Sequence, residues 1–409
     1  MLALVTQNNL PRIVATRLLA ALTPRAFVGP TAPIRLREIP DPPLPADDWL
    51  VIRTRLTGIC GSDAKQVFLK GGFDNPMTSM ISFPQVLGHE VVGTVERIGP
   101  GVRARRPGER VVLNPWLSCA TRGLPLCSWC QRGDLAQCLS FRRGALAPGI
   151  HHGNSREATG GFATLVPAHE SQCIPIPDAV PDEAAVLADP FAVSLHAILR
   201  HPPDGEVALV YGCGTLGLLA IAILRALHPA TRVFAVARFP HQAELARRFG
   251  AERAFAHAPA RELVAALGET LGAEQQVPWW GLPMLNGGVD AVYDTVASPQ
   301  TLEVGLRVTR SRGQIVALGV EAPRRFEWTP LYFKEIALVG SNAFGVEEHQ
   351  GRRQHAIEWY LEFAAGGVVD ATPILTHRFP LEAWREAFLS CFDQGRSGAV
   401  KVLFEFDQR

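Results

Sequence analysis

The chain has 409 residues, 47% of them hydrophobic, which is enough to form about two domains with substantial cores. Its 40 basic and 39 acidic residues leave a formal net charge of +1, so charge gives no reason to expect nucleic acid or another polyanion as a partner. No apolar run reaches the ~18 residues that cross a bilayer, so no membrane partner is expected. Residues 1–20 lack the apolar core and cleavage site of an export signal, which favours a reduced, cytoplasmic protein.

Residues 31–185 predict a predominantly β domain, preceded by an N-terminal extension over residues 1–33. Short β-rich runs such as WLVIRTRLTGI, HEVVGTVERIG and ERVVLNP are separated by Pro and Gly turns. The segment PDPPLPADD holds too many prolines for a helix or a central strand, so we expect a loop along a sheet edge.

Four cysteines lie close together in a segment rich in Arg, Gly and Pro, spaced Cys119-x7-Cys127-x2-Cys130-x7-Cys138. Thiolates bind zinc tetrahedrally, and a CxxC pair presents two sulfurs to one ion from a single tight turn. Disulfides are the alternative, but nothing in the sequence suggests export. The pattern therefore predicts a structural zinc lobe over residues 119–138. Whether Cys119 completes its ligand set stays open, because compact lobes place the first thiolate nearer the second.

From about residue 206 the pattern changes to alternating strands and helices. The run VALVY leads into GCGTLG, the helical LLAIAILRAL, the strand-like RVFAVA and the helical HQAELARRFGA, and DAVYDTV and GQIVALGV follow later. Such alternation predicts a right-handed, doubly wound parallel α/β sheet.

A glycine-rich turn joins the first strand of this region to its first helix. Gly212 permits the tight turn, Gly214 lets the backbone approach a pyrophosphate, and Gly217 lets helix and strand pack closely. The helix that begins at Thr215 and Leu216 offers backbone N–H groups and a positive dipole end to phosphates. The motif predicts a dinucleotide site at these five residues.

The end of the second strand bears on the choice of dinucleotide. An NAD site usually places Asp or Glu about 20 residues beyond the glycines, where the carboxylate bonds the ribose hydroxyls. This chain has Ala237 there, followed by Arg238, whose guanidinium suits a 2′-phosphate. The sequence therefore favours NADP over NAD, and a solvated loop arginine is the alternative.

Five motifs now occur in a recognisable order: GICGSD at 58–63, GHEVVGTVERIG at 88–99, the cysteine lobe, ADPFAVSLHA at 188–197 and GCGTLG at 212–217. Over residues 34–405 the chain resembles the zinc-dependent medium-chain alcohol dehydrogenases, including the sorbitol and threonine dehydrogenase branches. The resemblance implies a GroES-like β catalytic domain at 34–190, a Rossmann domain with a doubly wound parallel sheet at 191–345, and a C-terminal segment at 346–409 that completes the catalytic domain.

The resemblance also assigns a catalytic zinc, which would be the second zinc ion of the chain. Cys60 and His89 match the first two ligands of this metal, and Glu90 matches a carboxylate that ligates or exchanges at it in some members. Asp189 stands where relatives carry another ligand, so the third ligand is either Glu90 or Asp189. Taken singly, Cys60 would be a buried small hydrophobe, His89 a core histidine and Asp189 a helix N-cap.

Two more catalytic residues follow from the same match. Ser62 corresponds to the hydroxyl that passes the substrate proton outward, and Asp63 to a carboxylate behind the metal ligands. The chain departs from the family where GSD is followed by Ala64 and Lys65, because many relatives have His at the second of these positions. The spacing after Cys119 is also five residues longer than usual, with TRGLP inserted.

The implied activity is hydride transfer between an alcohol and a nicotinamide cofactor. Zinc would polarise the alcohol oxygen, and the small-molecule substrate would be a secondary alcohol, a polyol or an amino alcohol. A zinc-free quinone reductase of the same fold should lack Cys60, His89 and the cysteine lobe. The remaining alternative is a non-catalytic NADPH-binding sensor or scaffold. The family also implies a homodimer or homotetramer, in which GSNAFG and KVLFEF would pair or pack across a two-fold axis.

Two further segments have no assigned role in this scheme. Residues 263–288 lengthen the α/β region and contain Trp279 and Trp280, for which local core packing is favoured over an apolar cap or a subunit contact. Residues 68–84 are expected to form a loop over the substrate pocket, but their mixed polarity does not name a substrate.

Overall fold

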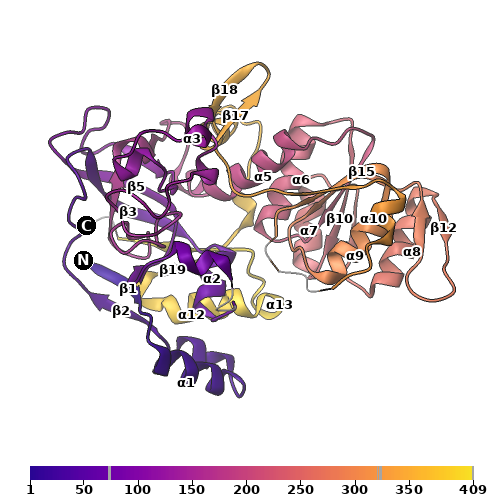
Figure 1. Ribbon diagram of the computed structural model, residues 1–409, viewed down its shortest axis with the longest axis horizontal. Coiled ribbons are helices and arrows are strands. Elements are labelled where there is room, and N and C mark those ends of the chain that lie inside the picture. The colour runs from indigo at the N-terminus through magenta and orange to yellow at the C-terminus, as the bar shows by residue number, and fades with distance from the viewer. Residues whose placement is uncertain (72–74, 320, 322–324, 408–409) are drawn as a thin grey trace. The chain divides into compact units, whose positions relative to one another are not determined.

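A computed structural model describes residues 1–71, 75–319, 321 and 325–407, which form two compact units (Figure 1). Unit 1 comprises Met1–Asp189 and Ile357–Arg409, and unit 2 comprises Pro190–Ala356. The predicted combination of a β domain with a doubly wound α/β domain is confirmed. The N-terminal residues belong to unit 1, and the chain re-enters unit 1 at residue 357. No helix in the described ranges has the length and apolarity to cross a membrane.

Unit 1 is built on a seven-stranded sheet with the order β19-β20-β3-β5-β6-β8, in which β7 also pairs with β3. Its strands are β3 (Trp49–Gly58), β5 (Glu90–Ile98), β6 (Arg110–Leu113), β7 (Leu165–His169), β8 (Cys173–Pro175), β19 (Leu375–Pro380) and β20 (Lys401–Glu405). The central strand β3 is almost wholly buried, and its apolar side chains pack with those of β5, β6 and β7. The buried face explains the β-rich patterns of this region.

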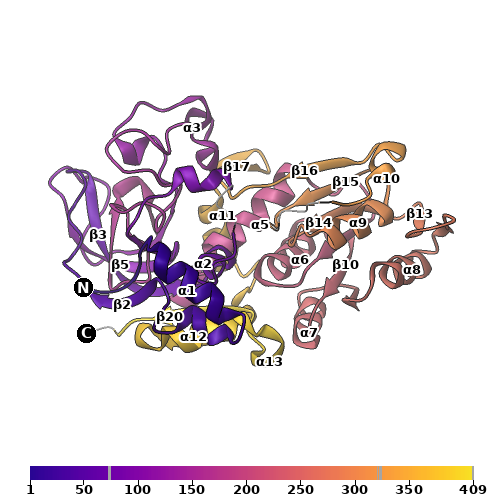
Figure 2. The same ribbon diagram turned by 60° about the horizontal axis from the view of Figure 1, so that its bottom comes forward.

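Helices cover the end of this sheet where β3 leads into α2 (Gly61–Val67). Phe68, just after α2, packs edge-on against Phe388 of α12 (Trp384–Phe392), with ring centroids 6.3 Å apart. Figure 2 shows α2 and α12 together beside the N-terminal helix α1 (Leu10–Ala20). Other helices of unit 1 are α3 (Ser128–Arg132), α4 (Asp182–Ala185), α11 (Ala356–Ala365) and α13 (Gln394–Ser397).

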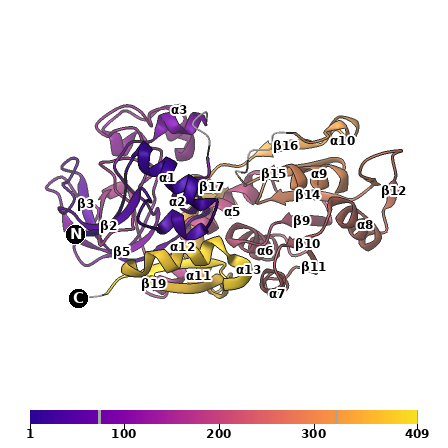
Figure 3. The same ribbon diagram turned by 90° about the horizontal axis from the view of Figure 1, so that it is seen from below.

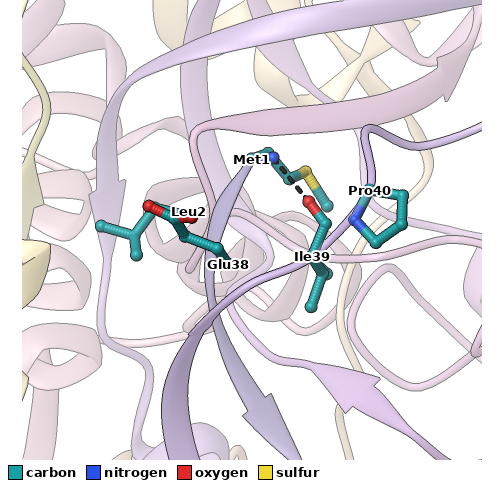
Figure 4. Close-up of a pocket in the computed structure, with 5 residues that line it drawn as sticks. All are labelled: Met1, Leu2, Glu38, Ile39 and Pro40. Atoms are coloured by element: carbon teal, nitrogen blue, oxygen red, sulfur yellow. Dashed lines mark hydrogen bonds between the residues drawn. The ribbon is translucent and has the colours of Figure 1, made fainter.

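The N-terminal residues are an integral part of unit 1 rather than a separate extension. Strand β1 (Leu2–Thr6) lies between β2 (Ile34–Glu38) and β4 (Gln85–Val86) in a three-stranded sheet. The backbone N–H of Leu4 donates to Phe162 O at 2.8 Å. Figure 4 shows the Met1 amino group bonded to Ile39 O, at 2.6 Å, beside a hollow of 410 Å³.

The part of loop 68–84 that the structure describes is tied to this N-terminal region. Arg17 of α1 donates from Nη2 to the carbonyls of Leu69 and Gly71, at 3.0 and 3.1 Å. Residues 72–74 are outside the described residues, so the predicted position of the loop over the substrate pocket stays a prediction.

Unit 2 holds a six-stranded sheet with the order β11-β10-β9-β14-β15-β16, in which every pair is parallel. The strands are β9 (Val207–Tyr211), β10 (Arg232–Ala237), β11 (Arg253–Ala256), β14 (Val289–Asp294), β15 (Thr309–Ala317) and β16 (Ala337–Gly340). The strand order reverses between β9 and β14, and ligands of such sheets bind at the carboxyl ends beside that reversal.

The helices of unit 2 lie on both faces of this sheet, as Figure 3 shows. On one face are α6 (Thr215–Leu227) and α7 (Pro240–Arg248), and on the other are α8 (Ala260–Leu271) and α9 (Pro299–Val308). This division follows from right-handed crossovers. The chain first runs from β9 through β10 to β11, and then from β14 through β15 to β16 on the other side of β9, so the helices of the two halves lie on opposite faces. The remaining helices are α5 (Ala188–Arg200), which begins in unit 1, and α10 (Thr329–Phe333). A small hairpin of β17 (Val346–His349) and β18 (Arg352–His355) completes the unit.

The insertion at 263–288 forms the end of α8 and an antiparallel hairpin of β12 (Glu274–Gln276) and β13 (Met284–Asn286). Trp279 is 98% exposed and Trp280 is 91% exposed. The interpretation of these residues as local core packing was therefore wrong. They lie in the loop beyond two strands of three residues each, where the unit provides no layer to cover them.

One expectation about intersubunit pairing is also corrected. KVLFEF forms β20, whose two edges are hydrogen-bonded to β19 and β3, so it has no edge left for a second chain. Strand β16, by contrast, ends the sheet of unit 2. GSNAFG contributes only Gly340 to that strand.

Candidate active site

The first group of predicted site residues lies where β3 passes into α2. Cys60 is the N-cap of this helix, and its backbone N–H donates to Asp63 Oδ2 at 3.0 Å. The other oxygen, Asp63 Oδ1, accepts the backbone N–H of Gly88 at 3.3 Å. Burial acts to raise the pKa of Asp63, but the facing His89 and these hydrogen bonds outweigh it and lower the pKa. A buried, ionised Asp63 thus holds the Cys60 turn against the turn that carries His89.

His89 and Glu90 stand at the start of β5. One ligand atom from each of Cys60, His89 and Glu90 lies within 4.8 Å of the others. His89 Nδ1 is 3.5 Å from Asp63 Oδ1 and makes no hydrogen bond, although it is buried. A thiolate, an imidazole and a carboxylate form the donor set that zinc binds in catalytic sites, with one position left for water or substrate. The residues therefore fit a zinc ion.

Glu90 has a partner that the sequence analysis missed. Its carboxylate forms an ion pair with Lys401 of β20, and both side chains are almost completely buried. Lys401 Nζ also donates to Ile59 O at 3.2 Å. A Cβ at Gly58 would overlap the Glu90 carboxylate, so glycine is required at this position. A lysine that begins the apolar run KVLFEF was the available signal, because an unpaired charge is not tolerated in a central strand.

Asp189 and Ser62 lie at the edges of this group. Asp189 is in the first turn of α5 and is buried, and that burial raises its pKa to about 7. It is outside the group formed by Cys60, His89 and Glu90. Ser62 is in the first turn of α2 and is exposed, which leaves its hydroxyl accessible to solvent.

A histidine that the sequence analysis did not single out packs on His89. The ring of His151 has its centroid 4.5 Å from that of His89, at an interplanar angle of 44°. The ring of His151 also meets that of Trp116 edge-on, with centroids 6.0 Å apart. Burial lowers the pKa of His151 to about 3, and the charge of His89 acts in the same direction. The sequence signal was the polar run HHGN, which stands between the cysteine lobe and β7, outside the five motifs that carry the resemblance.

The second group is the cysteine lobe, in which the structure brings all four sulfurs together. Cys119, Cys127, Cys130 and Cys138 lie within 4.8 Å of one another through their Sγ atoms. Cys119 Sγ is 3.5 Å from Cys138 Sγ, far beyond the ~2.05 Å of a disulfide and close to the ~3.8 Å edge of a tetrahedron with Zn–S bonds of ~2.3 Å. All four are free thiols.

The surroundings of the lobe also fit a cation. Backbone N–H groups point at two of the sulfurs: that of Cys127 at Cys119 Sγ, 3.4 Å away, and that of Ser140 at Cys138 Sγ, 3.3 Å away. Burial raises the pKa of Cys138 to about 11. Four clustered thiols would not all ionise by themselves, and a zinc ion supplies the positive charge that allows them to do so.

The inserted TRGLP segment has a structural role in this lobe. Arg122 is 1% exposed and donates hydrogen bonds to five backbone carbonyls, those of Leu117, Arg143, Leu146, Ala147 and Gly149. Its guanidinium has five N–H donors in a planar fork, so one side chain orders the loop that follows the lobe.

The nucleotide site is formed by the turn between β9 and α6. Gly212 has φ +94°, where a Cβ would lie 2.7 Å from Thr295 Oγ1. Gly214 is the N-cap of α6 and has open space around it, and a Cβ at Gly217 would overlap Gly212 O. The three glycines thus provide the tight turn, the open approach and the close helix–strand packing that a pyrophosphate site needs. Thr215 and Leu216 begin the helix, whose first amides have no acceptor within it.

Strand β10 ends at the residues that were predicted to select the cofactor. Ala237 is its last residue and is buried, so no carboxylate stands at this strand end. Arg238 is exposed, and its guanidinium lies 5.2 Å from the ring centroid of Phe239. Helix α7 begins two residues later, at Pro240. An arginine beside a helix N-terminus is a favourable environment for a phosphate.

A dinucleotide turn on one unit and a thiolate–imidazole–carboxylate cluster on the other define a metal-dependent nicotinamide oxidoreductase. Comparison with known proteins specifies the class. A family model described as alcohol dehydrogenase GroES-like domain matches residues 46–178, and one described as zinc-binding dehydrogenase matches residues 215–362. L-threonine 3-dehydrogenase of Anaeromyxobacter dehalogenans is 30% identical over 366 residues, which cover 89% of this chain and 93% of that protein.

Solved structures give the same result. 2R,3R-butanediol dehydrogenase from Bacillus subtilis is 25% identical, with a TM-score of 0.69 over 91% of this chain and 96% of that one. A putative zinc-binding dehydrogenase from Sinorhizobium meliloti, bound to NADP, is 26% identical, with a TM-score of 0.68 over 91% and 95%. The chain belongs to the zinc-dependent medium-chain alcohol dehydrogenase family. It is an oxidoreductase that transfers hydride between an alcohol and a nicotinamide cofactor, as the sequence predicted.

Proposed function

We propose that this enzyme oxidises a secondary alcohol, a polyol or an amino alcohol with NADP, at a zinc ion held by Cys60, His89 and Glu90. The observation that carries the proposal is the convergence of these three side chains within 4.8 Å, in a largely buried position. Glu90 is preferred to Asp189 as the third ligand because Asp189 is outside this group. A second zinc ion would occupy the four-cysteine lobe.

The chain's own residues would prepare the site and move the proton. Zinc held by Cys60, His89 and Glu90 would supply Lewis acidity toward the alcohol oxygen, and NADP at the glycine turn would supply the hydride acceptor. Asp63 fixes the turns that carry Cys60 and His89, and Lys401 holds the Glu90 carboxylate in the buried site. The exposed hydroxyl of Ser62 would pass the substrate proton to solvent.

The test is a panel of secondary alcohols, polyols and amino alcohols, each offered with NADP and with NAD while the absorbance of the reduced nicotinamide is followed. Turnover of at least one compound, by protein that contains two zinc ions per chain, is expected. Protein that binds NADPH but oxidises nothing in the panel would favour the alternative of a non-catalytic sensor or scaffold.

Cofactor preference supplies a sharper prediction. A charge-assisted hydrogen bond contributes about 1.5–3 kcal/mol, so Arg238→Ala should weaken NADP binding by roughly ten- to hundredfold and NAD binding far less. Dissociation constants from fluorescence titration measure both effects. Arg248→Ala, at the other end of α7, is the matched control and should change neither constant. A wild-type enzyme that binds NAD more tightly than NADP would refute the assignment of Arg238.

We also propose that the enzyme is a homodimer or a dimer of dimers, formed through the β16 edge of unit 2. This strand carries no charged side chain, and Leu338 on it is 36% exposed. Elsewhere on unit 2, a groove of 620 Å³ is lined by the inserted hairpin, α9 and α10, and the exposed rings of Trp280 and Phe333 belong to its lining. Among the described residues β16 is hydrogen-bonded in the sheet to β15 alone, and such a strand edge can pair with its own copy across a two-fold axis.

Leu338→Lys should convert this assembly to monomers, because it places a charge on the edge that would pair. Mass measured by light scattering across a range of concentrations gives the result, with Ala256→Lys on the opposite edge strand β11 as the control. A wild-type chain that is a monomer at every concentration would rule out the proposed interface.

A further inference from the structure

His151 stands against a proposed metal ligand but is absent from the motifs that identify the site. Its backbone is fixed on one side by a bridge to Trp116, with the N–H of Leu117 donating to Ile150 O at 3.0 Å. The N–H of His152 donates to Pro115 O at 2.9 Å. The backbone at His151 is therefore held by the segment that leads into the cysteine lobe.

The two shortest contacts of the His151 ring nitrogens fit one tautomer of the ring. Its Nδ1 is 2.6 Å from the carbonyl oxygen of His152, which can only accept, so Nδ1 carries the proton. Nε2 is then an acceptor, and Asn154 Nδ2 donates to it at 2.8 Å. Asn154 Oδ1 in turn accepts from Gln66 Nε2 at 3.3 Å. Asn154 Nδ2 also lies 3.3 Å from Nδ1, so the pairing with Nε2 is assigned from the shorter of its two distances to the ring.

These contacts belong to a chain of contacts that begins and ends on helix α2, beside the proposed metal site. Gln66 belongs to α2, the helix whose N-cap is Cys60 and whose first turn carries Asp63. Asp63 faces Nδ1 of His89, at 3.5 Å, and the ring of His89 packs on that of His151. His151 is in turn connected to α2 through its hydrogen bond with Asn154 and that of Asn154 with Gln66. The imidazole of His89 is thus held from two directions by groups that are both anchored to the helix that presents Cys60.

We propose that His151, braced by Asn154, is a positioning residue that fixes the orientation of His89 toward the catalytic metal. The inference rests on the proposed assignment of Cys60 and His89 as metal ligands. Groups that orient metal ligands commonly change metal affinity or activity by about 10- to 100-fold when they are removed. His151 holds the imidazole by ring contact, because its own two nitrogens are occupied by His152 O and Asn154.

The experiment measures the rate at which each of the two zinc ions leaves the full-length protein in excess chelator. His151→Ala should release the catalytic zinc about 10- to 100-fold faster, while the zinc of the cysteine lobe leaves at the wild-type rate. Asn154→Ala should act in the same direction, and the double variant should fall short of the product of the two effects, because both act through one contact. Cobalt in the catalytic site should show a shifted visible absorption spectrum in His151→Ala.

The controls separate this inference from its premise and from misfolding. His169→Gln changes another histidine of unit 1, which is bonded to Ser171 and Asp48, and should release both ions at wild-type rates. Retention of the lobe zinc shows that unit 1 has kept its fold. If the wild-type protein holds zinc in the lobe alone, the proposed function fails. If it holds both ions and folded His151→Ala matches it in release rate and cobalt spectrum, the role of His151 is wrong.

Discussion

Replacing Cys60 or His89 with alanine is expected to abolish alcohol oxidation and leave nucleotide binding almost unchanged. Each change removes a proposed ligand of the metal that polarises the substrate oxygen, an effect of several kcal/mol, so kcat/KM should fall by at least about a thousandfold. The nucleotide turn at Gly212–Gly217 lies on unit 2, whereas both ligands lie on unit 1. Turnover assays and NADPH titration of the same preparations measure the two functions separately.

Cys173→Ala provides the matched control, since this cysteine is buried in the core of unit 1 with apolar neighbours and should keep full activity. Turnover near the wild-type rate in either ligand variant would remove Cys60 and His89 from the catalytic site. Loss of NADPH binding in those variants would show instead that the two functions do not separate.

Cys127→Ser is expected to lose one of two zinc ions and to lower the stability of unit 1 strongly. The apparent binding free energy of structural zinc is about 10–16 kcal/mol in small zinc-binding peptides, and much of it contributes to folding. The lobe is long and irregular, with only short helical turns, so it has little else to hold it in place. Elemental analysis counts the metal, and thermal unfolding measures the loss of stability.

For this prediction Cys391→Ser is the control, because Cys391 lies on α12 outside both ligand groups and should leave the zinc count unchanged. Fresh, chelator-free wild-type protein with one zinc or none would contradict the two-site assignment. So would a Cys127→Ser protein that retains both ions.

The features that the sequence predicted most accurately are those that depend on residues close together in the chain. The glycine turn could be read from Gly212, Gly214 and Gly217, because backbone conformation and close approach depend on the residues themselves. The four cysteines of the lobe likewise lie within one continuous segment. Cys60 and Asp63 were both assigned from the short motif GICGSD, and the start of α2 brings them together.

The partners that the sequence did not reveal join distant segments. Lys401 meets Glu90 only because β20 lies beside β3, and nothing in KVLFEF specifies that neighbour. The N-terminal residues could not be assigned to unit 1, since their partner Phe162 is far along the chain. Trp279 and Trp280 were misassigned for the opposite reason, because hydrophobicity alone does not show whether a covering layer exists.

Arg122 gives the inserted TRGLP segment a consequence beyond the lobe itself. Extra residues in a surface loop can normally be deleted at little cost. Here the side chain of Arg122 holds the residues around the lobe in place from the interior. Its removal would leave five backbone carbonyls without their hydrogen-bond donor. The last of these, at Gly149, is two residues before His151. The conformation of the chain as far as the residues beside His151 thus depends on Arg122, so deleting TRGLP would disturb far more than the loop that contains it.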